Sequence, residues 1–136
     1  MNAHHFGITV RDLDAAVAFY RDELGLELIE RFSVSGEGFE TGVGVPDAEA
    51  DFAHLDLGDA RLELVSYDPQ GEDRRGGDVN DAGAKHLGIG VESVQEVYDS
   101  LSDPVETLSE PQTTASGSVI CFVRDPEGNL IELIET

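Results

Sequence analysis

Apolar residues alternate with polar ones or glycine in two short segments that lie far apart in the chain, His5–Val10 and His86–Val91. Such alternation predicts β-strands with one buried face. The two segments share a histidine at the start, a glycine two positions later, an isoleucine next and a valine at the end. This match indicates an internal repeat, with one strand opening each half of the chain.

A helix is predicted after each of these strands. In the first half Asp12 is the expected N-cap, apolar residues follow at helical spacing, and Gly25 is the expected stop. In the second half Ser93 and Glu96 have the spacing of a capping box. Each half is therefore expected to begin with a strand and a helix.

A second pair of matching segments closes the two halves. Leu62–Val65 and Ile131–Ile134 each carry a glutamate between apolar residues. Further short β-type runs, Phe52–Leu57 and Ser118–Val123, precede them. The order within each half is thus βαβββ, and the predicted fold class is α+β.

The chain is expected to be a single domain over its 136 residues, with two modules joined by a linker. The first module covers residues 1–67, the linker residues 68–84 and the second module residues 85–136. The linker is rich in glycine, aspartate and arginine and poor in apolar residues. Residues 36–51 are expected to hold the extra length of the first module.

The charge balance limits the possible partners. Eight lysines and arginines stand against 29 aspartates and glutamates, which gives a net charge of −21 and argues against nucleic acid. The acids are spread over the whole chain, as would suit a very salty cytoplasm that screens their repulsion. No apolar run is long enough for a membrane span and no signal peptide pattern is found, so a cytoplasmic protein without a membrane partner is expected. Cys121, the single cysteine, stands in an apolar stretch and is predicted to be a buried, inert thiol.

The two histidine strands offer space for a ligand. Strand alternation places Gly7 on the same face as His5, and Gly88 on the same face as His86. A glycine there keeps room open beside the imidazole for a metal or a ligand. Taken alone, either histidine could be an ordinary half-exposed residue.

The glutamates of the closing strands suggest what the histidines bind. Glu63 and Glu132 each stand within an apolar run, where an inward-facing carboxylate is costly unless it is paired or coordinates a cation. Their recurrence in both halves favours a site over two solvent-facing residues. The predicted metal ligands are His5, Glu63, His86 and Glu132. His4 and His54 have no counterpart in the repeat and are interpreted as surface or ligand-supporting residues, with His4 facing away from His5.

Three stretches of the sequence together resemble one known superfamily. They are His5–Leu13 with Ala18–Leu26, then His86–Val91, and finally Phe122–Glu135. They resemble the opening, the second-module start and the C-terminal signature of the glyoxalase I, bleomycin-resistance and extradiol-dioxygenase superfamily, also called the vicinal oxygen chelate superfamily. The matches span the chain and are specific for the superfamily, but much less so for one activity.

The resemblance implies that the modules form a cupped mixed sheet around a divalent metal, usually within a homodimer, where substrate oxygens replace water. Two glutamates favour a glyoxalase I-like lyase or isomerase acting on a small oxygen-rich substrate, with Glu132 as base and ligand. The metal would polarise a carbonyl and stabilise an enediolate while the carboxylate moves a proton. Mixed histidine and glutamate ligation suits zinc, nickel, cobalt, manganese or iron.

The sequence departs from glyoxalase I where specificity should lie. After Glu63 it lacks an Asn-x-Gly pattern, and no lysine or arginine stands between Leu101 and Ser118 to hold the carboxylates of a thiol cofactor. Both departures argue against glutathione as co-substrate. The candidates for binding an anionic substrate are Arg11, Arg74 and Arg75.

Two other functions stay open. An extradiol-type dioxygenase would use Fe(II), for which two histidines and one carboxylate suffice. A binding protein of the bleomycin-resistance type would trap a drug without changing it, and an acidic cup could attract a cationic one.

Overall fold

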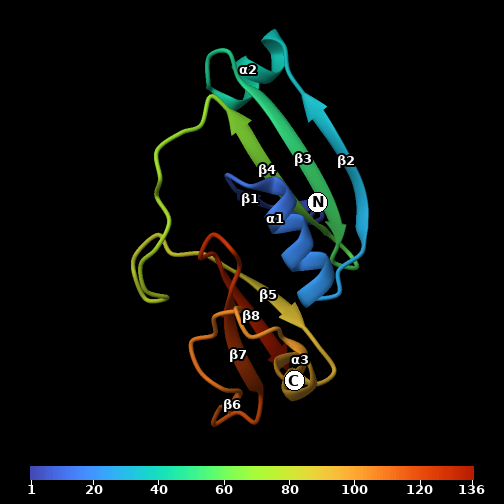
Figure 1. Cartoon of the computed structure of the whole chain (residues 1–136), viewed down its shortest axis with the longest axis vertical. Helices are drawn as coiled ribbons and strands as arrows, with labels where there is room; N and C mark the ends of the chain where they lie inside the picture. The colour runs from blue at the N-terminus through green and yellow to red at the C-terminus, as the bar shows by residue number, and fades with distance from the viewer. The chain divides into compact units, whose positions relative to one another are not determined.

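The computed structural model describes residues 1–136 as two compact units, residues 1–73 and residues 74–136 (Figure 1). Each unit carries one four-stranded mixed sheet, and the chain has three α-helices. The predicted α+β class and the βαβββ order of each half are confirmed. None of the helices combines the length and the apolar character that a membrane crossing requires.

The first unit contains a complete βαβββ motif with one additional helix. Its elements are β1 (His5–Thr9), α1 (Leu13–Ala18), the π-helix η1 (Phe19–Glu23), β2 (Leu28–Val34), α2 (Glu37–Val43), β3 (Glu49–Asp56) and β4 (Arg61–Asp68). The strand order is β1-β4-β3-β2, with β1 parallel to β4 and the other neighbours antiparallel. The closing strand therefore lies beside the opening strand.

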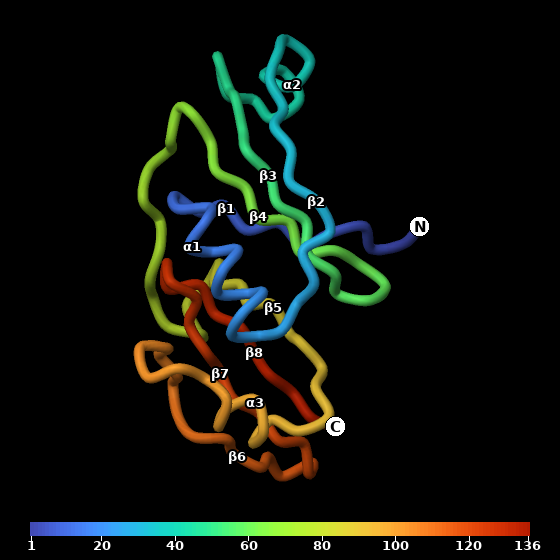
Figure 2. Tube along the Cα trace, turned by 45° about the vertical axis from the view of Figure 1, so that its right-hand side comes forward, coloured from blue at the N-terminus to red at the C-terminus, as the bar shows by residue number.

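The second unit repeats this arrangement. Its elements are β5 (His86–Gly90), α3 (Val94–Ser100), β6 (Gln112–Thr113), β7 (Val119–Arg124) and β8 (Leu130–Glu135). The strand order is β5-β8-β7-β6, and β5 is again parallel to its neighbour β8. Between β4 and β5, residues 69–85 carry neither helix nor strand. Figure 2 shows the path of this segment as a yellow-green tube.

Both predicted helix starts are confirmed. The Asp12 carboxylate accepts a hydrogen bond from the backbone N–H of Ala15 at 3.0 Å, and the Ser93 hydroxyl accepts one from that of Glu96 at 3.2 Å. These bonds satisfy N–H groups that the first turn leaves free. The helical segment formed by α1 and η1 ends at Glu23, two residues before the predicted stop at Gly25, whose φ of 72° is a left-handed conformation that glycine adopts without strain.

The additional helix α2 was not predicted. It falls inside residues 36–51, where only extra length was expected. Its sequence contains two glycines and none of its residues is fully buried, so no continuous apolar stripe marks it as a helix. One side chain, Phe39, packs on the sheet against Phe52 and Tyr67.

Each sheet has one face covered by its own helix. In the first unit α1 packs on β3 and β4, where Leu55, Leu62 and Leu64 are fully buried. In the second unit α3 packs on β7 and β8, where Val123 and Ile131 are fully buried. Burying such side chains contributes about 1.5–3 kcal/mol each. The opposite face of the first sheet carries polar side chains beside a second apolar cluster built on Ala50, Phe52 and Val65.

The turn between β7 and β8 is held by a buried carboxylate. Asp125 is only 4% exposed and accepts hydrogen bonds at 2.9 Å from the backbone N–H groups of Glu127 and Asn129 and from the Asn129 side chain. Asp125→Ala should lower the free energy of unfolding by about 1–3 kcal/mol, because buried donors lose their partner. Urea unfolding beside Asp103→Ala, an exposed aspartate of the same unit, measures the effect. Equal midpoints for both variants would contradict it.

Candidate metal centre

The closing strands turn their glutamates away from the helices. On β4, Leu62 and Leu64 are fully buried, and Glu63 between them points to the opposite face. On β8, Ile131 and Leu133 are buried, and Glu132 between them points to the opposite face. The side-chain directions predicted for both strands are therefore confirmed.

In the first unit the predicted histidine and glutamate lie together. The Nε2 atom of His5 is 3.6 Å from Oε1 of Glu63, although β1 and β4 place Gly7, not His5, directly beside Glu63. A Cβ atom added at Gly7 would lie 3.9 Å from Oε1 of Glu63 and 4.0 Å from the His5 ring. Gly7 thus leaves open the space between the two candidate ligands.

The second unit repeats this pair. The Nε2 atom of His86 is 3.2 Å from Oε2 of Glu132, and Gly88 is the strand neighbour of Glu132. A Cβ atom at Gly88 would lie 4.0 Å from that same carboxylate. Both halves therefore build the same arrangement of histidine, glycine and glutamate at the same register.

Both pairs are suited to holding a cation. The carboxylate side chains of Glu63 and Glu132 are only 17% and 21% exposed, whereas the side chains of His5 and His86 are 39% and 40% exposed. Each pair offers one imidazole nitrogen and one carboxylate oxygen, the donors that divalent transition metals accept. Neither unit alone gathers three histidine, cysteine, aspartate or glutamate side chains able to hold a metal. Each unit thus offers two candidate donors.

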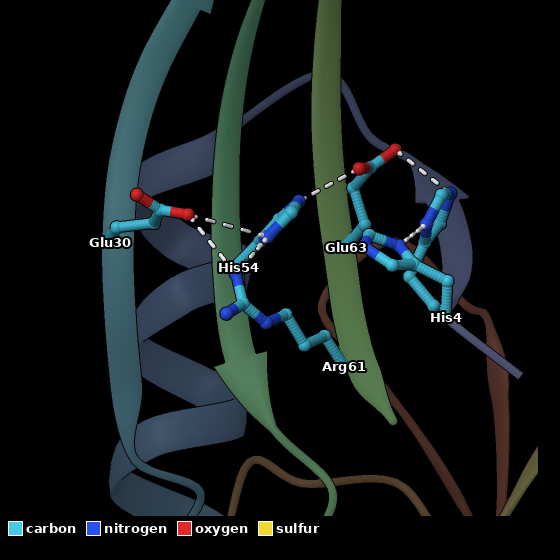
Figure 3. Close-up of polar contacts among 6 residues, drawn as sticks. His4, Glu30, His54, Arg61 and Glu63 are labelled. Carbon is cyan, nitrogen blue, oxygen red and sulfur yellow. Dashed lines mark hydrogen bonds and ion pairs between the residues drawn. The ribbon is translucent and has the colours of Figure 1, made fainter. Parts of the chain in front are cut away.

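For His54 the structure excludes one of the two predicted interpretations, that of a surface residue. As a surface residue it would be solvent-exposed, yet it is only 5% exposed and its Nε2 lies 2.8 Å from Oε2 of Glu63. Of the two roles allowed for it, ligand support therefore agrees with the structure. Figure 3 shows His54 between Glu63 and a pair formed by Glu30 and Arg61. Sequence reasoning missed this network because its residues come from three different strands.

His4 also differs from its predicted orientation. Instead of facing away from His5, it places its Nδ1 atom 2.7 Å from Nδ1 of His5, with the rings edge to face. The alternation rule does not apply to His4, because β1 begins only at His5. The contact with His4 occupies the Nδ1 atom of His5. The other ring nitrogen of His5, Nε2, is the one near Glu63.

An aromatic surface adjoins the polar residues on this face. The rings of Phe32 and Phe52 stack with centroids 5.0 Å apart, and Phe39 stacks on Tyr67 at 6.2 Å. Burial, and secondly the charge of Glu63, raises the pKa of the Tyr67 hydroxyl. Tyr67 therefore stays protonated at neutral pH and can donate a hydrogen bond.

The remaining candidates have other surroundings. Cys121 is buried as predicted, and burial raises the pKa of its thiol, which favours the unreactive protonated form. Arg75 donates to the Glu127 carboxylate at 3.2 Å. Arg11 and Arg74 are exposed.

Comparison with known sequences places the chain in a family. Residues 2–133 match the glyoxalase/bleomycin resistance protein/dioxygenase superfamily. The chain is 32% identical to a probable lactoylglutathione lyase of Synechocystis, with 97% of this chain and 93% of the relative covered. It is also 32% identical to a 2-epi-5-epi-valiolone epimerase of Actinomyces, with 96% and 77% covered.

Comparison with solved structures agrees. A glyoxalase family protein from Bacillus cereus superposes with a TM-score of 0.88 at 28% identity, covering 99% of this chain and 93% of that one. The trypanothione-dependent glyoxalase I of Leishmania major gives a TM-score of 0.69 at 25% identity, with 99% and 86% covered. The chain thus belongs to the glyoxalase/bleomycin resistance protein/dioxygenase superfamily.

Proposed function

We propose that the protein is a metal-dependent lyase or isomerase of the glyoxalase I type, acting on a small oxygen-rich substrate. The proposed ligands of one divalent ion are His5, Glu63, His86 and Glu132, gathered within one chain or between two copies of it. Zinc, nickel, cobalt, manganese and iron all suit this donor set. We also propose that the protein works as a homodimer in the cytoplasm.

One observation carries this proposal. The two units present the same pair in the same register, with His5 Nε2 3.6 Å from the Glu63 carboxylate and His86 Nε2 3.2 Å from the Glu132 carboxylate. Two equivalent pairs supply four donors of the right chemistry, and each carboxylate is mostly shielded from water. The relatives named lactoylglutathione lyase and epimerase support a reaction of the lyase or isomerase class.

In the proposed reaction the chain's own residues bind the substrate and move a proton. A bound divalent metal would act as a Lewis acid that stabilises negative charge on substrate oxygens. Glu132 would take a proton from one substrate carbon and return it to the adjacent carbon. The aromatic residues Phe32 and Tyr67 would exclude water from one side of the site, and the Tyr67 hydroxyl would donate to a substrate oxygen.

An exchange assay tests the proposed function. The protein, loaded in turn with each candidate metal, is incubated in deuterated water with hemithioacetals that methylglyoxal forms with glutathione and with other thiols. We expect metal-dependent conversion and solvent deuterium in the product, as seen by NMR. Since the chain lacks a basic residue between Leu101 and Ser118, we expect no preference for glutathione.

Other results of this assay would favour the remaining functions of the superfamily. Oxygen consumption with catechols and Fe(II), without exchange, would replace the proposal by a dioxygenase. Tight binding of a cationic drug, without turnover of any substrate or dependence on metal, would replace it by a sequestering protein.

A further inference from the structure

The two candidate carboxylates differ in what stands opposite them in the sheet. On the antiparallel neighbour strand, His54 pairs with Glu63, whereas Phe122 pairs with Glu132. The two positions are equivalent in the repeated topology, because each lies on the third strand of its unit. The duplicated frame therefore gives one glutamate a polar neighbour and the other an apolar one.

The polar neighbour of Glu63 belongs to a chain of hydrogen bonds (Figure 3). The Arg61 guanidinium donates to Glu30 at 3.1 Å and lies 3.2 Å from Nδ1 of His54. A guanidinium can only donate, so Nδ1 of His54 must accept and the ring hydrogen stands on Nε2. That Nε2–H then donates to Oε2 of Glu63 at 2.8 Å.

His54 is held rigidly in this position. Its ring meets the edge of Phe32 with centroids 5.1 Å apart, and it lies nearly parallel to the His5 ring at 6.3 Å. Its side chain is only 6% exposed, so water cannot replace its hydrogen bond to Glu63. One oxygen of Glu63 is thereby fixed, and the other, Oε1, faces His5.

Glu132 has different surroundings within its own unit. Phe122 cannot donate a hydrogen bond, and its ring meets His86 edge to face with centroids 5.2 Å apart. The polar contact that the unit gives the Glu132 side chain is the one with His86 at 3.2 Å. The Glu132 carboxylate thus lacks, within its unit, a counterpart of the His54 hydrogen bond that fixes one oxygen of Glu63.

We propose that His54 is a positioning residue, oriented by Arg61, that holds Glu63 as a fixed single-oxygen ligand and leaves proton transfer to Glu132, which has no such partner. This inference rests on the proposed metal-dependent function and assigns unequal roles to the two glutamates. Partners that orient a ligand side chain strengthen metal binding, and their loss typically costs 10–100-fold in affinity.

The experiment titrates Co²⁺ into the metal-free protein and records both the affinity and the visible absorption spectrum. His54→Phe, which copies the residue of the second unit, should weaken cobalt binding roughly 10–100-fold and alter the spectrum. His54→Gln should restore most of the affinity, because its side-chain amide can still donate to Glu63. Glu49→Gln, an exposed change on the same strand, is the matched control and should behave as wild type.

The outcomes separate this proposal from the proposed function. A wild type that binds no cobalt would contradict the metal-dependent function itself. A wild type that binds cobalt, with His54→Phe equal to it in affinity and spectrum, would overturn the role of His54 alone. If His54→Phe does not fold, Arg61→Met provides the test. It removes the guanidinium from a side chain that is 40% exposed, and it should also weaken binding.

A second readout needs no variant. Nitrogen–proton correlation NMR of the histidine rings in the metal-free protein reports which nitrogen of His54 carries the hydrogen. The proposal expects it on Nε2. A His54 ring with its hydrogen on Nδ1 would overturn the proposal, because Nε2 could not then donate to Glu63.

Discussion

Glu132→Gln is expected to reduce turnover by roughly 10²–10⁴-fold while the protein stays folded, because the amide cannot accept the substrate proton. Glutamine has the size and shape of glutamate, and the Glu132 side chain lies on the face of β8 away from the buried Ile131 and Leu133. The rate of deuterium exchange, measured with the metal content of the same sample, gives the effect. Separating the two quantities matters because Glu132 is also a proposed ligand.

The matched control for this variant is Glu110→Gln. It makes the same chemical change at an exposed glutamate of the same unit. It should keep the activity of the wild type. An active Glu132→Gln protein with full metal content would exclude Glu132 as the base.

Removal of the metal is expected to lower the free energy of unfolding substantially. A metal that binds only the folded state stabilises it by about 4 kcal/mol when its free concentration is about 1,000 times Kd. His86→Ala should abolish this response, because it removes one of the proposed donors. The side chain of His86 is 40% exposed, so the substitution leaves no large cavity that would itself destabilise the protein.

Urea unfolding with and without added metal measures this response. Glu110→Gln again serves as the control and should respond like the wild type. A His86→Ala variant that gains as much stability from metal as the wild type would show that the metal binds elsewhere.

Much of the fold could be predicted because local signals agreed with one another. The repeated strand around His5 and His86, the N-caps Asp12 and Ser93 and the stop at Gly25 all depend on nearby residues. The faces of the strands follow from alternation alone. Helix α2 could not be found in this way, because Phe39 packs on the sheet but no apolar stripe marks the segment as a helix.

Predicting the contact between His54 and Glu63 requires the register of β3 against β4. The sequence contains a signal for that register. Leu57 donates to Ala60 across the Gly58-Asp59 turn, so residues equally distant from this turn face each other. His54 and Glu63 are such a pair. The pairing was not predicted because His54 was interpreted only as a residue without a counterpart in the repeat.

The links from Arg61 to Glu30 and His54 could not be predicted by the same reasoning. Glu30 comes from β2, and its register against β3 is irregular near Leu28. A long arginine side chain can also reach several partners. Only the folded sheet shows that Arg61 contacts Glu30 and the His54 ring together.

The most direct test of the central claim is the metal content per chain, measured by mass spectrometry on protein purified without chelators. Wild type is compared with Glu63→Ala, His86→Ala and the control Glu110→Gln. We expect close to one divalent ion per chain in wild type and control, and a marked loss in both ligand variants. A wild type that stays metal-free after divalent ions are added back, or variants that retain full occupancy, would contradict it.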